Sequence, residues 1–377
     1  MPLILKLAFR NLIHDRLRFI ATLIGIVVSI VLVTVQLGLY LGFERMVTTM
    51  IDHASADLWI VPQGTKCFED PSLLDARKQF RARAVDGVAE TAAVVLGFAD
   101  WRMPGGSITP VFVVGSDLRS RGLLPWNLVE GDVEALATPN AIAVDRSYFR
   151  TLGITGLDAS AEIRRQRVRV VAATNGIRSF TMTPYVFMSI DRARAYIGIS
   201  PDEATYILVR LAPGADPRAV RRQLLANMSD VEVLTSSEFR GRSRSFWLFG
   251  TGAGAALLGG ALLGLTVGTV IVALTLYSNT KEHLIEFATL RAMGSSSRYI
   301  HKVIICQALI SAAIGFCIAK VIDDAIVTMT ASSPLPIIIT SNLTVSLFVL
   351  TILMCIASAT AAIMKVTRID PVIVFAR

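Results

Sequence analysis

The chain has 377 residues, of which 53% are hydrophobic and only 18% are charged, and its formal net charge is +8. In a typical soluble protein about a quarter of the residues are charged, so this composition excludes an ordinary soluble globular protein. Four long apolar segments hold most of the excess of hydrophobic residues. We therefore predict a polytopic membrane protein.

The first apolar segment, residues 19–43, contains 25 residues without a charged side chain. About 20 apolar residues are enough to cross a bilayer, and the core of a cleaved signal peptide is shorter, so we expect a permanent transmembrane helix. Residues 1–18 carry four basic side chains and one acidic side chain. The positive-inside rule places this N-terminal segment in the cytoplasm.

Residues 44–244 have the composition of a folded domain, with 25 basic and 23 acidic side chains. Short β-branched or alternating runs, such as 57–62, 111–115 and 168–173, are separated by helical patterns such as 217–228. This mixture predicts an α+β fold. Because one span precedes the domain, we expect it to be extracytoplasmic, that is, periplasmic.

The remaining topology follows from the apolar segments and from charge. The cytoplasmic parts have an excess of Lys and Arg, whereas the last outer loop has acids and no Lys or Arg. In chain order we expect a second span at 245–280, a cytoplasmic coupling loop at 281–298, a third span at 299–322, an extracytoplasmic loop at 323–342, a fourth span at 343–364 and a cytoplasmic tail at 365–377. The predicted fold is an α-helical membrane protein with four transmembrane helices and a large extracytoplasmic α+β domain inserted between helices 1 and 2.

Glycines recur at four-residue spacing in two of the predicted spans. Gly260, Gly264 and Gly268 lie in the second span, and Gly38 and Gly42 lie in the first. Small residues at positions i and i+4 allow two helices to approach closely, so we interpret both sets as helix-packing surfaces within a dimer. The alternative is that glycine is simply common in membrane helices.

Three charged residues, Lys320, Asp323 and Asp324, lie near the outer end of the third predicted span. Charges inside a membrane are costly and often functional. Lys320 and Asp324 have the i, i+4 spacing of a helical ion pair. We favour the alternative that the side chains reach out to the interface, and the sequence assigns them no role.

The sequence lacks the common motifs of catalysis and cofactor binding. It contains no His-x-x-x-His or Cys-x-x-Cys metal motif, no Gly-x-Ser-x-Gly nucleophile turn and no phosphate-binding Gly-x-x-x-x-Gly-Lys loop. We predict no catalytic, cofactor-binding or metal site in this chain, so nucleotide hydrolysis must come from another chain. The excess of basic residues lies beside the apolar segments, which indicates membrane topology and not nucleic-acid binding.

Three segments resemble motifs of the FtsX/MacB-type ABC transporter permeases, a family also described as type VII or mechanotransmission transporters. They are LAFRNL at 7–12 followed by RLR at 16–18, KEHLIEFATLRAMGS at 281–295, and VTRIDP at 366–371. The second resembles the family's loop motif, in which a glutamate precedes a leucine-arginine-alanine-small-glycine run. The layout of one span, a large domain and three spans is also similar to that family.

Within the family, two segments resemble the DevC branch, whose members are permease components of exporters for glycolipids and related amphiphiles. They are LWIVP at 58–62 and GFADWR at 97–102. Gln307 departs from the pattern, because many relatives have a glutamate early in the third span. A functional role for that carboxylate is therefore in doubt here.

The loop motif is also interpretable from its residues. On a helix, Glu282, Glu286, Leu290 and Gly294 share one face, and Phe287 with Leu290 supplies an apolar anchor. The resemblance implies that this helix docks on a cytosolic ATPase. The predicted coupling residues are Glu282, Glu286, Phe287, Leu290, Arg291 and Gly294. The alternative is an amphipathic connector on the lipid surface, with Arg291 contacting headgroups.

The resemblance implies a permease subunit of an ATP-driven exporter in the bacterial inner membrane, with both termini in the cytoplasm. Its implied partners are two ABC ATPase subunits that bind ATP and Mg, a second copy of the chain, membrane lipids, a periplasmic adaptor and an outer-membrane channel. The implied cargo is a hydrophobic or amphipathic molecule such as a glycolipid, another lipid or a drug. Heme is an alternative cargo, although no clustered iron ligands occur.

Two other functions remain open. The first is an FtsX-like regulator of a cell-wall hydrolase, whose outer domain is typically smaller and whose cytoplasmic N-terminus is longer. The second is a membrane sensor, which would need a cytoplasmic effector domain that this layout does not provide. The large outer domain and the short N-terminus disfavour the regulator, and the lack of an effector domain in this layout disfavours the sensor. We therefore favour the exporter.

Overall fold

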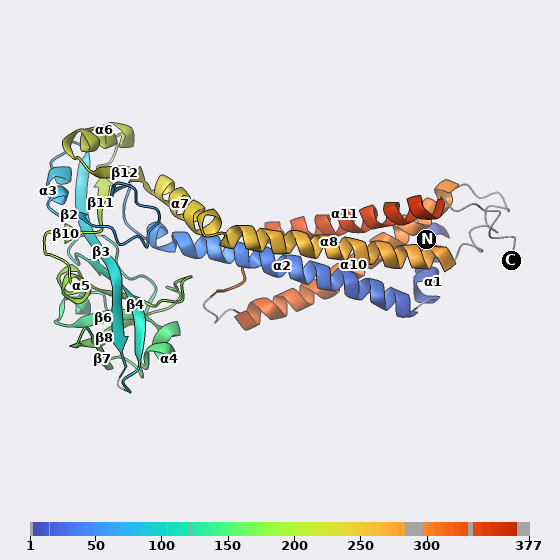
Figure 1. Ribbon diagram of the computed structural model, residues 1–377, viewed down its shortest axis with the longest axis horizontal. Coiled ribbons are helices and arrows are strands. Elements are labelled where there is room, and N and C mark those ends of the chain that lie inside the picture. The colour runs from blue at the N-terminus through green and yellow to red at the C-terminus, as the bar shows by residue number, and fades with distance from the viewer. Residues whose placement is uncertain are drawn as a thin grey trace. The chain divides into compact units, whose positions relative to one another are not determined.

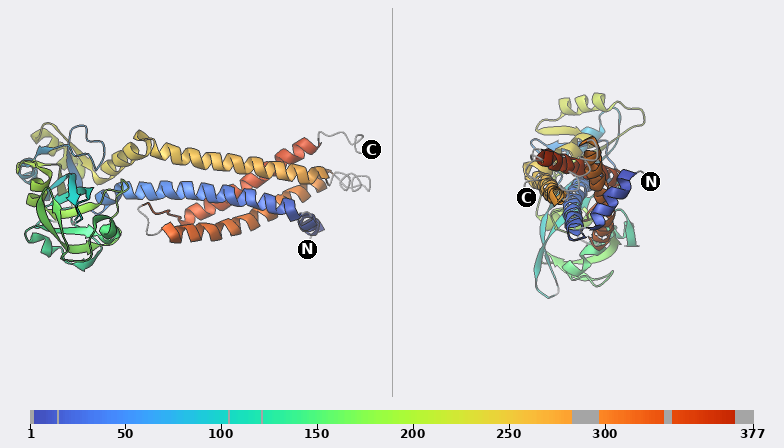
Figure 2. Two further views of the ribbon diagram at one scale, coloured as in Figure 1. Left: turned by 60° about the horizontal axis from the view of Figure 1, so that its bottom comes forward. Right: turned by 90° about the vertical axis from the view of Figure 1, so that its right-hand side faces the viewer.

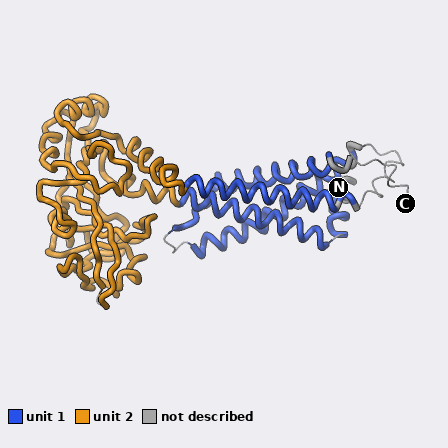
Figure 3. The backbone as a smooth tube through the Cα atoms, in the orientation of Figure 1, with its two compact units in different colours: residues 1–42, 254–377 blue, residues 43–253 orange. Residues whose placement is uncertain are grey.

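The computed structural model describes residues 3–14, 16–103, 105–120, 122–282, 297–330 and 335–367. The chain divides into two compact units (Figure 3). The helical unit comprises Met1–Gly42 and Gly254–Arg377, and the inserted domain comprises Phe43–Ala253. The chain therefore leaves the helical unit once and returns to it.

Four long helices and one short helix make up the described part of the helical unit. They are α1 (Leu3–His14), α2 (Arg16–Asp52), α8 (Ala253–Glu282), α10 (Ser297–Thr330) and α11 (Ser341–Thr367) (Figure 1). The four long helices contain segments long and apolar enough to cross a membrane, namely Arg16–Asp52, Ala253–Ser278, His301–Thr330 and Ser341–Met364. A helix satisfies its own backbone hydrogen bonds, which is the condition for crossing lipid.

All four long helices contribute to one apolar core, and their other faces remain apolar. Side chains at most 1% exposed come from each of them: Ile26, Val272, Ile304 and Cys355. Large apolar side chains on the outside are more than half exposed, among them Ile24, Leu263 and Val345. Figure 2 shows the four helices along their length and from one end. An apolar exterior of this extent is suited to contact with lipid.

The second span was predicted to begin at residue 245, but its helix begins later. A π-helical turn, Phe246–Gly250, follows α7 (Ser236–Ser245), and α8 starts only at Ala253. The interruption occurs at Gly252, whose φ of +79° is a left-handed conformation that glycine adopts without strain. The prediction rested on the lack of charged residues in 245–280, which does not indicate where a helix is interrupted.

The third helix extends beyond the predicted boundary at residue 322. α10 continues to Thr330, so the first part of the predicted 323–342 loop is helical. The two acids that suggested a boundary are accommodated within the helix. Asp324 pairs with Lys320 one turn earlier, and Asp323 is buried.

The inserted domain is built on a ten-stranded mixed sheet with the strand order β12-β1-β11-β3-β4-β9-β6-β8-β5, and β7 pairs with β3 and β8. Among the described strands, only the β4–β9 and β6–β8 pairs are parallel. The strands are β1 (Leu58–Pro62), β3 (Val88–Arg102), β4 (Ile108–Ser116), β5 (Leu128–Gly131), β6 (Ala141–Asp145), β7 (Ser160–Ile163), β8 (Gln166–Thr174), β9 (Tyr185–Ser189), β11 (Tyr206–Leu211) and β12 (Val231–Thr235). A separate pair joins β2 (Leu74–Asp75) to β10 (Glu203–Ala204).

Short helices connect these strands. They are α3 (Lys78–Arg83), α4 (Phe149–Leu152), α5 (Ile190–Ile197), α6 (Pro217–Asn227) and α7, with 3-10 turns at Glu134–Ala137 and Arg146–Tyr148. α6 begins with Pro217 after the N-cap Asp216, whose carboxylate accepts hydrogen bonds from two backbone N–H groups. α7 begins with a capping box formed by Thr235 and Glu238. These local signals account for where both helices start.

The sheet of the inserted domain has an apolar core on each face. Val95 and its neighbours on one face pack with Ala193 of α5 and Leu224 of α6. Val94 and Leu96 point to the other face, which is rich in aromatic rings. Alternate side chains of a strand point to opposite faces, so a strand covered on both sides is apolar throughout. The predicted fold class, with four apolar helices and an α+β domain between the first and the second, is confirmed.

Candidate functional site

The predicted coupling segment lies almost entirely outside the described residues. Glu282 is the last residue of α8, and the described chain resumes at Ser297, the first residue of α10. The other predicted coupling residues lie outside the described residues: Glu286, Phe287, Leu290, Arg291 and Gly294. The segment thus joins the C-terminal end of α8 to the N-terminal end of α10.

Three of the predicted packing glycines lie where α8 meets α2. A Cβ atom added at Gly260 would lie 2.7 Å from Nε2 of Gln36, and one added at Gly264 would lie 2.9 Å from Cδ2 of Leu32. Both distances are too short for a real side chain. A side chain at either position would force the end of Gln36 or Leu32 to move, so its absence permits the close approach of the two helices.

The third of these glycines, Gly268, is packed against Ser29. A Cβ atom there would overlap the serine side chain, whose Oγ donates a hydrogen bond to the carbonyl oxygen of Gly264 at 2.9 Å. The partners of the three glycines, Gln36, Leu32 and Ser29, are about one turn apart on α2. The antiparallel helices therefore remain in close contact over successive turns.

The remaining two glycines pack against the segment that precedes α11. A Cβ atom at Gly38 would lie 2.5 Å from Cγ2 of Ile337, and the carbonyl oxygen of Gly38 accepts a hydrogen bond from the backbone N–H of Ile338 at 3.1 Å. A Cβ atom at Gly42 would overlap the carbonyl oxygen of Pro336. All five glycines thus make contacts within one chain, and their role in a dimer stays a prediction.

The three charged residues of α10 have different environments. Lys320 and Asp324 form an ion pair within the helix. Asp323 is only 4% exposed, and its Oδ1 has no hydrogen-bond partner among the described residues. Burial of Asp323 differs from the interfacial position that we favoured for this group of residues. Burial depends on which side of α10 meets its neighbours, which residue spacing alone did not indicate.

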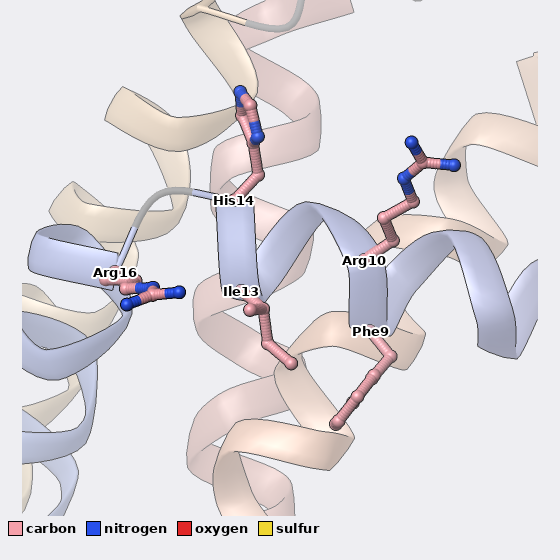
Figure 4. Close-up of a pocket in the computed structure, with 5 residues that line it drawn as sticks. All are labelled: Phe9, Arg10, Ile13, His14 and Arg16. Carbon is pink, nitrogen blue, oxygen red and sulfur yellow. The ribbon is translucent and has the colours of Figure 1, made fainter.

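A basic cavity lies where α1 turns into α2 (Figure 4). It has a volume of 520 Å³ and is lined by Phe9, Arg10, Ile13, His14 and Arg16. All five side chains are exposed. Apolar side chains interleaved with basic ones suit contact with anionic lipid headgroups at a membrane surface.

The inserted domain contains an aromatic cavity of 280 Å³, which we call the Glu69 pocket. Its rings come partly from one row across three strands. Phe98 on β3 is paired with Phe112 on β4, and Phe112 is paired with Tyr185 on β9. The ring centroids are 4.8 Å and 5.7 Å apart in these two pairs, both with edge-to-face geometry. Strand register therefore aligns the three rings on one face of the sheet.

Glu69 is a buried carboxylate in this pocket and is 8% exposed. Its Oε1 accepts a hydrogen bond from the hydroxyl of Tyr185 at 3.1 Å, and its Oε2 accepts one from Nε1 of Trp247 at 2.9 Å. Burial raises the pKa of Glu69 to about 7, although both donors favour the ionised form. The carboxyl group is therefore poised to change its charge near neutral pH.

The segment that carries Glu69 is held in place by the core of the domain. The hydroxyl of Tyr206 lies 3.0 to 3.1 Å from the carbonyl oxygens of Cys67, Phe68 and Asp70. Burial, reinforced by the charge of Glu69, raises the pKa of Cys67 to about 12. The Cys67 thiol therefore stays protonated and is not suited to nucleophilic chemistry.

The Glu69 pocket was not predicted from the sequence. Its lining residues are Lys66, Cys67, Glu69, Asp70, Pro71, Phe98, Phe112, Ser179, Thr181, Tyr185, Phe246 and Trp247. Glu69 is 116 residues from Tyr185 and 178 residues from Trp247. No short motif connects residues so far apart, so no sequence signal pointed to this pocket.

Two family models match the chain. The MacB-like periplasmic core domain matches residues 19–227, and the FtsX-like permease C-terminal domain matches residues 258–371. No curated protein matches the chain.

Two solved structures are similar to part of the chain. The periplasmic region of MacB from Actinobacillus actinomycetemcomitans is 10% identical, with a TM-score of 0.40, over 51% of this chain and 94% of that chain. The extracellular domain of the noncanonic ABC-type transporter YknZ from Gram-positive bacteria is 12% identical, with a TM-score of 0.35, over 48% of this chain and 99% of that chain.

The two family models together extend from the first long helix to the C-terminal segment, in the order that the fold shows. The first alone covers more than half of the chain. Permeases of this kind are membrane components of ABC transporters and are not themselves catalytic. The protein therefore belongs to the MacB/FtsX-like family of ABC transporter permeases.

Proposed function

We propose that the protein is the permease subunit of an ATP-driven exporter that extrudes a hydrophobic or amphipathic molecule. The observation that carries this proposal is the union, in one chain, of a MacB-like periplasmic core domain with an FtsX-like permease domain. The DevC-like segments support a glycolipid-like or other lipid cargo. A size of 211 residues for the inserted domain supports the exporter over an FtsX-like regulator.

The proposed mechanism transmits motion from a cytosolic ATPase to the inserted domain. Two ABC ATPase subunits bind ATP and Mg and close against each other, and each contacts the 281–298 segment of one permease copy. Displacement of this segment moves α8 and α10, because it joins their ends. The glycine contacts pass the motion from α8 to α2, which continues without a break to Asp52 in the inserted domain.

The proposed topology places the chain in a bacterial inner membrane with both termini in the cytoplasm. The basic residues of 1–18, 281–298 and 365–377 support this orientation. The inserted domain then lies in the periplasm, where it contacts an adaptor that leads to an outer-membrane channel. A second copy of the chain completes the permease.

The proposal is tested by recovery of the complex from the native membrane. The tagged permease is purified in mild detergent, co-purifying chains are identified by mass spectrometry, and ATPase activity of the eluate is measured. An ABC ATPase together with an adaptor is the expected result. A cell-wall hydrolase in place of the adaptor would support the FtsX-like regulator, and absence of an ATPase would contradict both functions.

Two substitutions test the coupling segment directly. Glu286→Lys reverses a charge and Leu290→Asp removes an apolar anchor, so each should reduce ATPase recovery at least about tenfold, as loss of about 1.4 kcal/mol of binding would. Glu134→Lys makes the same charge change at an exposed position of the inserted domain and serves as the control. Equal ATPase recovery in all three variants would contradict the coupling assignment.

A further inference from the structure

The Glu69 pocket has the size and the lining of a binding site for a small molecule. A cavity of about 150 Å³ is enough for benzene, and the Glu69 pocket has a volume of 280 Å³. Five aromatic rings line it: Phe98, Phe112, Tyr185, Phe246 and Trp247. The faces of aromatic rings are electron-rich and attract cations more strongly where water is excluded.

The charges at the pocket also favour a cation. Glu69 and Asp70 line it together with one basic residue, Lys66. Tyr185 and Trp247 each donate one hydrogen bond to Glu69, but a carboxylate offers about four acceptor sites, so further acceptor capacity remains. When Glu69 is ionised, a neutral ligand would leave the buried negative charge without a counter-charge, and an anion would be repelled.

We propose that the Glu69 pocket binds a small organic cation, in which an ammonium group pairs with Glu69 and an apolar body packs against the aromatic rings. The proposal concerns binding by the inserted domain. It does not depend on which molecule the transporter exports, and it holds equally for a regulator.

Binding should be coupled to ionisation of Glu69. Burial raises the pKa of Glu69 to about 7, so the carboxylate that pairs with a cation forms mainly above neutral pH. Of the other groups at the pocket, Cys67 has a pKa raised to about 12 and Tyr185 a pKa raised well above its ordinary value. Lys66 and Asp70 are the remaining charged groups. Affinity for the cation should therefore rise about tenfold between pH 6 and pH 8.

The test uses the full chain in lipid nanodiscs and isothermal titration calorimetry. The probe is benzylammonium, whose N–H groups can donate hydrogen bonds to Glu69, and benzyl alcohol and benzoate are its uncharged and anionic counterparts. We expect the cation to bind at least about tenfold more tightly than either counterpart at pH 8. Failure of the cation to bind, or equal binding of benzyl alcohol or benzoate, would overturn the proposal.

Matched variants connect the binding to this pocket. Glu69→Gln should weaken cation binding at least about tenfold and abolish its dependence on pH, whereas Glu134→Gln, at an exposed position, should leave both unchanged. Phe98→Leu, at a ring that is 54% exposed, should weaken cation binding several-fold.

The outcome remains decisive if Glu69→Gln does not fold, because the pH series on the unaltered chain tests the contact with Glu69 and the Phe98→Leu variant tests the contact with the rings. Unchanged affinity in Glu69→Gln, or affinity independent of pH in the unaltered chain, would show that Glu69 does not hold the cation.

Discussion

At the scale of single residues, burial changes the chemistry of Glu69. In water a glutamate is ionised at neutral pH, but in the inserted domain its charge is surrounded by aromatic rings. Two donated hydrogen bonds compensate this loss of water only in part. The residue type was visible in the sequence, whereas its environment depends on Tyr185 and Trp247, which only the fold brings near.

The raised pKa of Glu69 predicts a particular dependence of stability on pH. The pKa is about 7 in the folded chain and 4.5 for an ordinary glutamate, so the folded state holds the proton more tightly. This contribution to stability is fully present below about pH 4.5 and is lost as pH rises through about 7, with a difference of at most about 3 kcal/mol.

Thermal unfolding of the full chain at several pH values measures this effect. Relative to Glu69→Gln, the unaltered chain should lose melting temperature between pH 5 and pH 8. The comparison uses the slopes with pH, because the substitution also changes two hydrogen bonds. Parallel slopes in the two proteins would contradict the buried ionisation of Glu69.

At the scale of elements, the glycine row of α8 lies at the contact of this helix with α2, whereas the two glycines of α2 contact the segment that precedes α11. The i, i+4 pattern indicated a packing surface, and each glycine meets a side chain or carbonyl group of the same chain. The pattern did not identify the partner, because any helix with a suitable groove can receive a row of glycines. The effect of substituting a glycine of α8 should depend on its position, since neighbouring glycines differ in what surrounds them.

Two glycines of α8 provide a matched pair of substitutions. A Cβ atom at Gly264 would lie 2.9 Å from Leu32, whereas one at Gly259 would meet nothing within 4 Å. Gly264→Val should therefore destabilise the helical unit by about 1–3 kcal/mol through overpacking. Gly259→Val makes the same chemical change in open space and should have little effect.

Detergent melting curves and yields of monodisperse protein distinguish the two variants. A lower melting temperature for Gly264→Val alone is the expected result. If the two variants behaved alike, the close contact between α8 and α2 would be refuted.

At the scale of the whole molecule, the order of the elements along the chain agrees with the family: one apolar helix, an inserted α+β domain and three further apolar helices. The helices expose apolar side chains suited to lipid, and the domain carries a balanced set of charges suited to water. The boundaries between the two units can therefore be located in the sequence from the change between apolar and charged composition. The side of the membrane on which each lies depends on the charges beside the spans.

Labelling of single cysteines tests the proposed orientation. In a background without the four native cysteines, Glu134→Cys in the inserted domain should react with a maleimide that crosses the outer membrane but not the inner membrane. His14→Cys in α1 should react only after the inner membrane is permeabilised. Both positions are exposed, so access to the reagent and not burial decides the result. The reverse labelling pattern would show that the chain has the opposite orientation in the membrane.

The sequence by itself determined the features that depend on neighbouring residues. These are the four apolar segments, the charge bias beside them, the i, i+4 spacing of Lys320 with Asp324, and the loop motif at 281–295. Each is readable because a helix brings together residues three or four positions apart, and because transfer into lipid depends on the composition of about 20 consecutive residues.

Only the tertiary structure decided the features that join distant residues. Strand register aligns Phe98, Phe112 and Tyr185, and the fold places Trp247 against Glu69. Likewise, helix packing buries Asp323 while its neighbour Asp324 stays exposed. Burial and pairing of these groups depend on contacts between different strands and helices, and a local pattern carries no information about which distant side chain will be the neighbour.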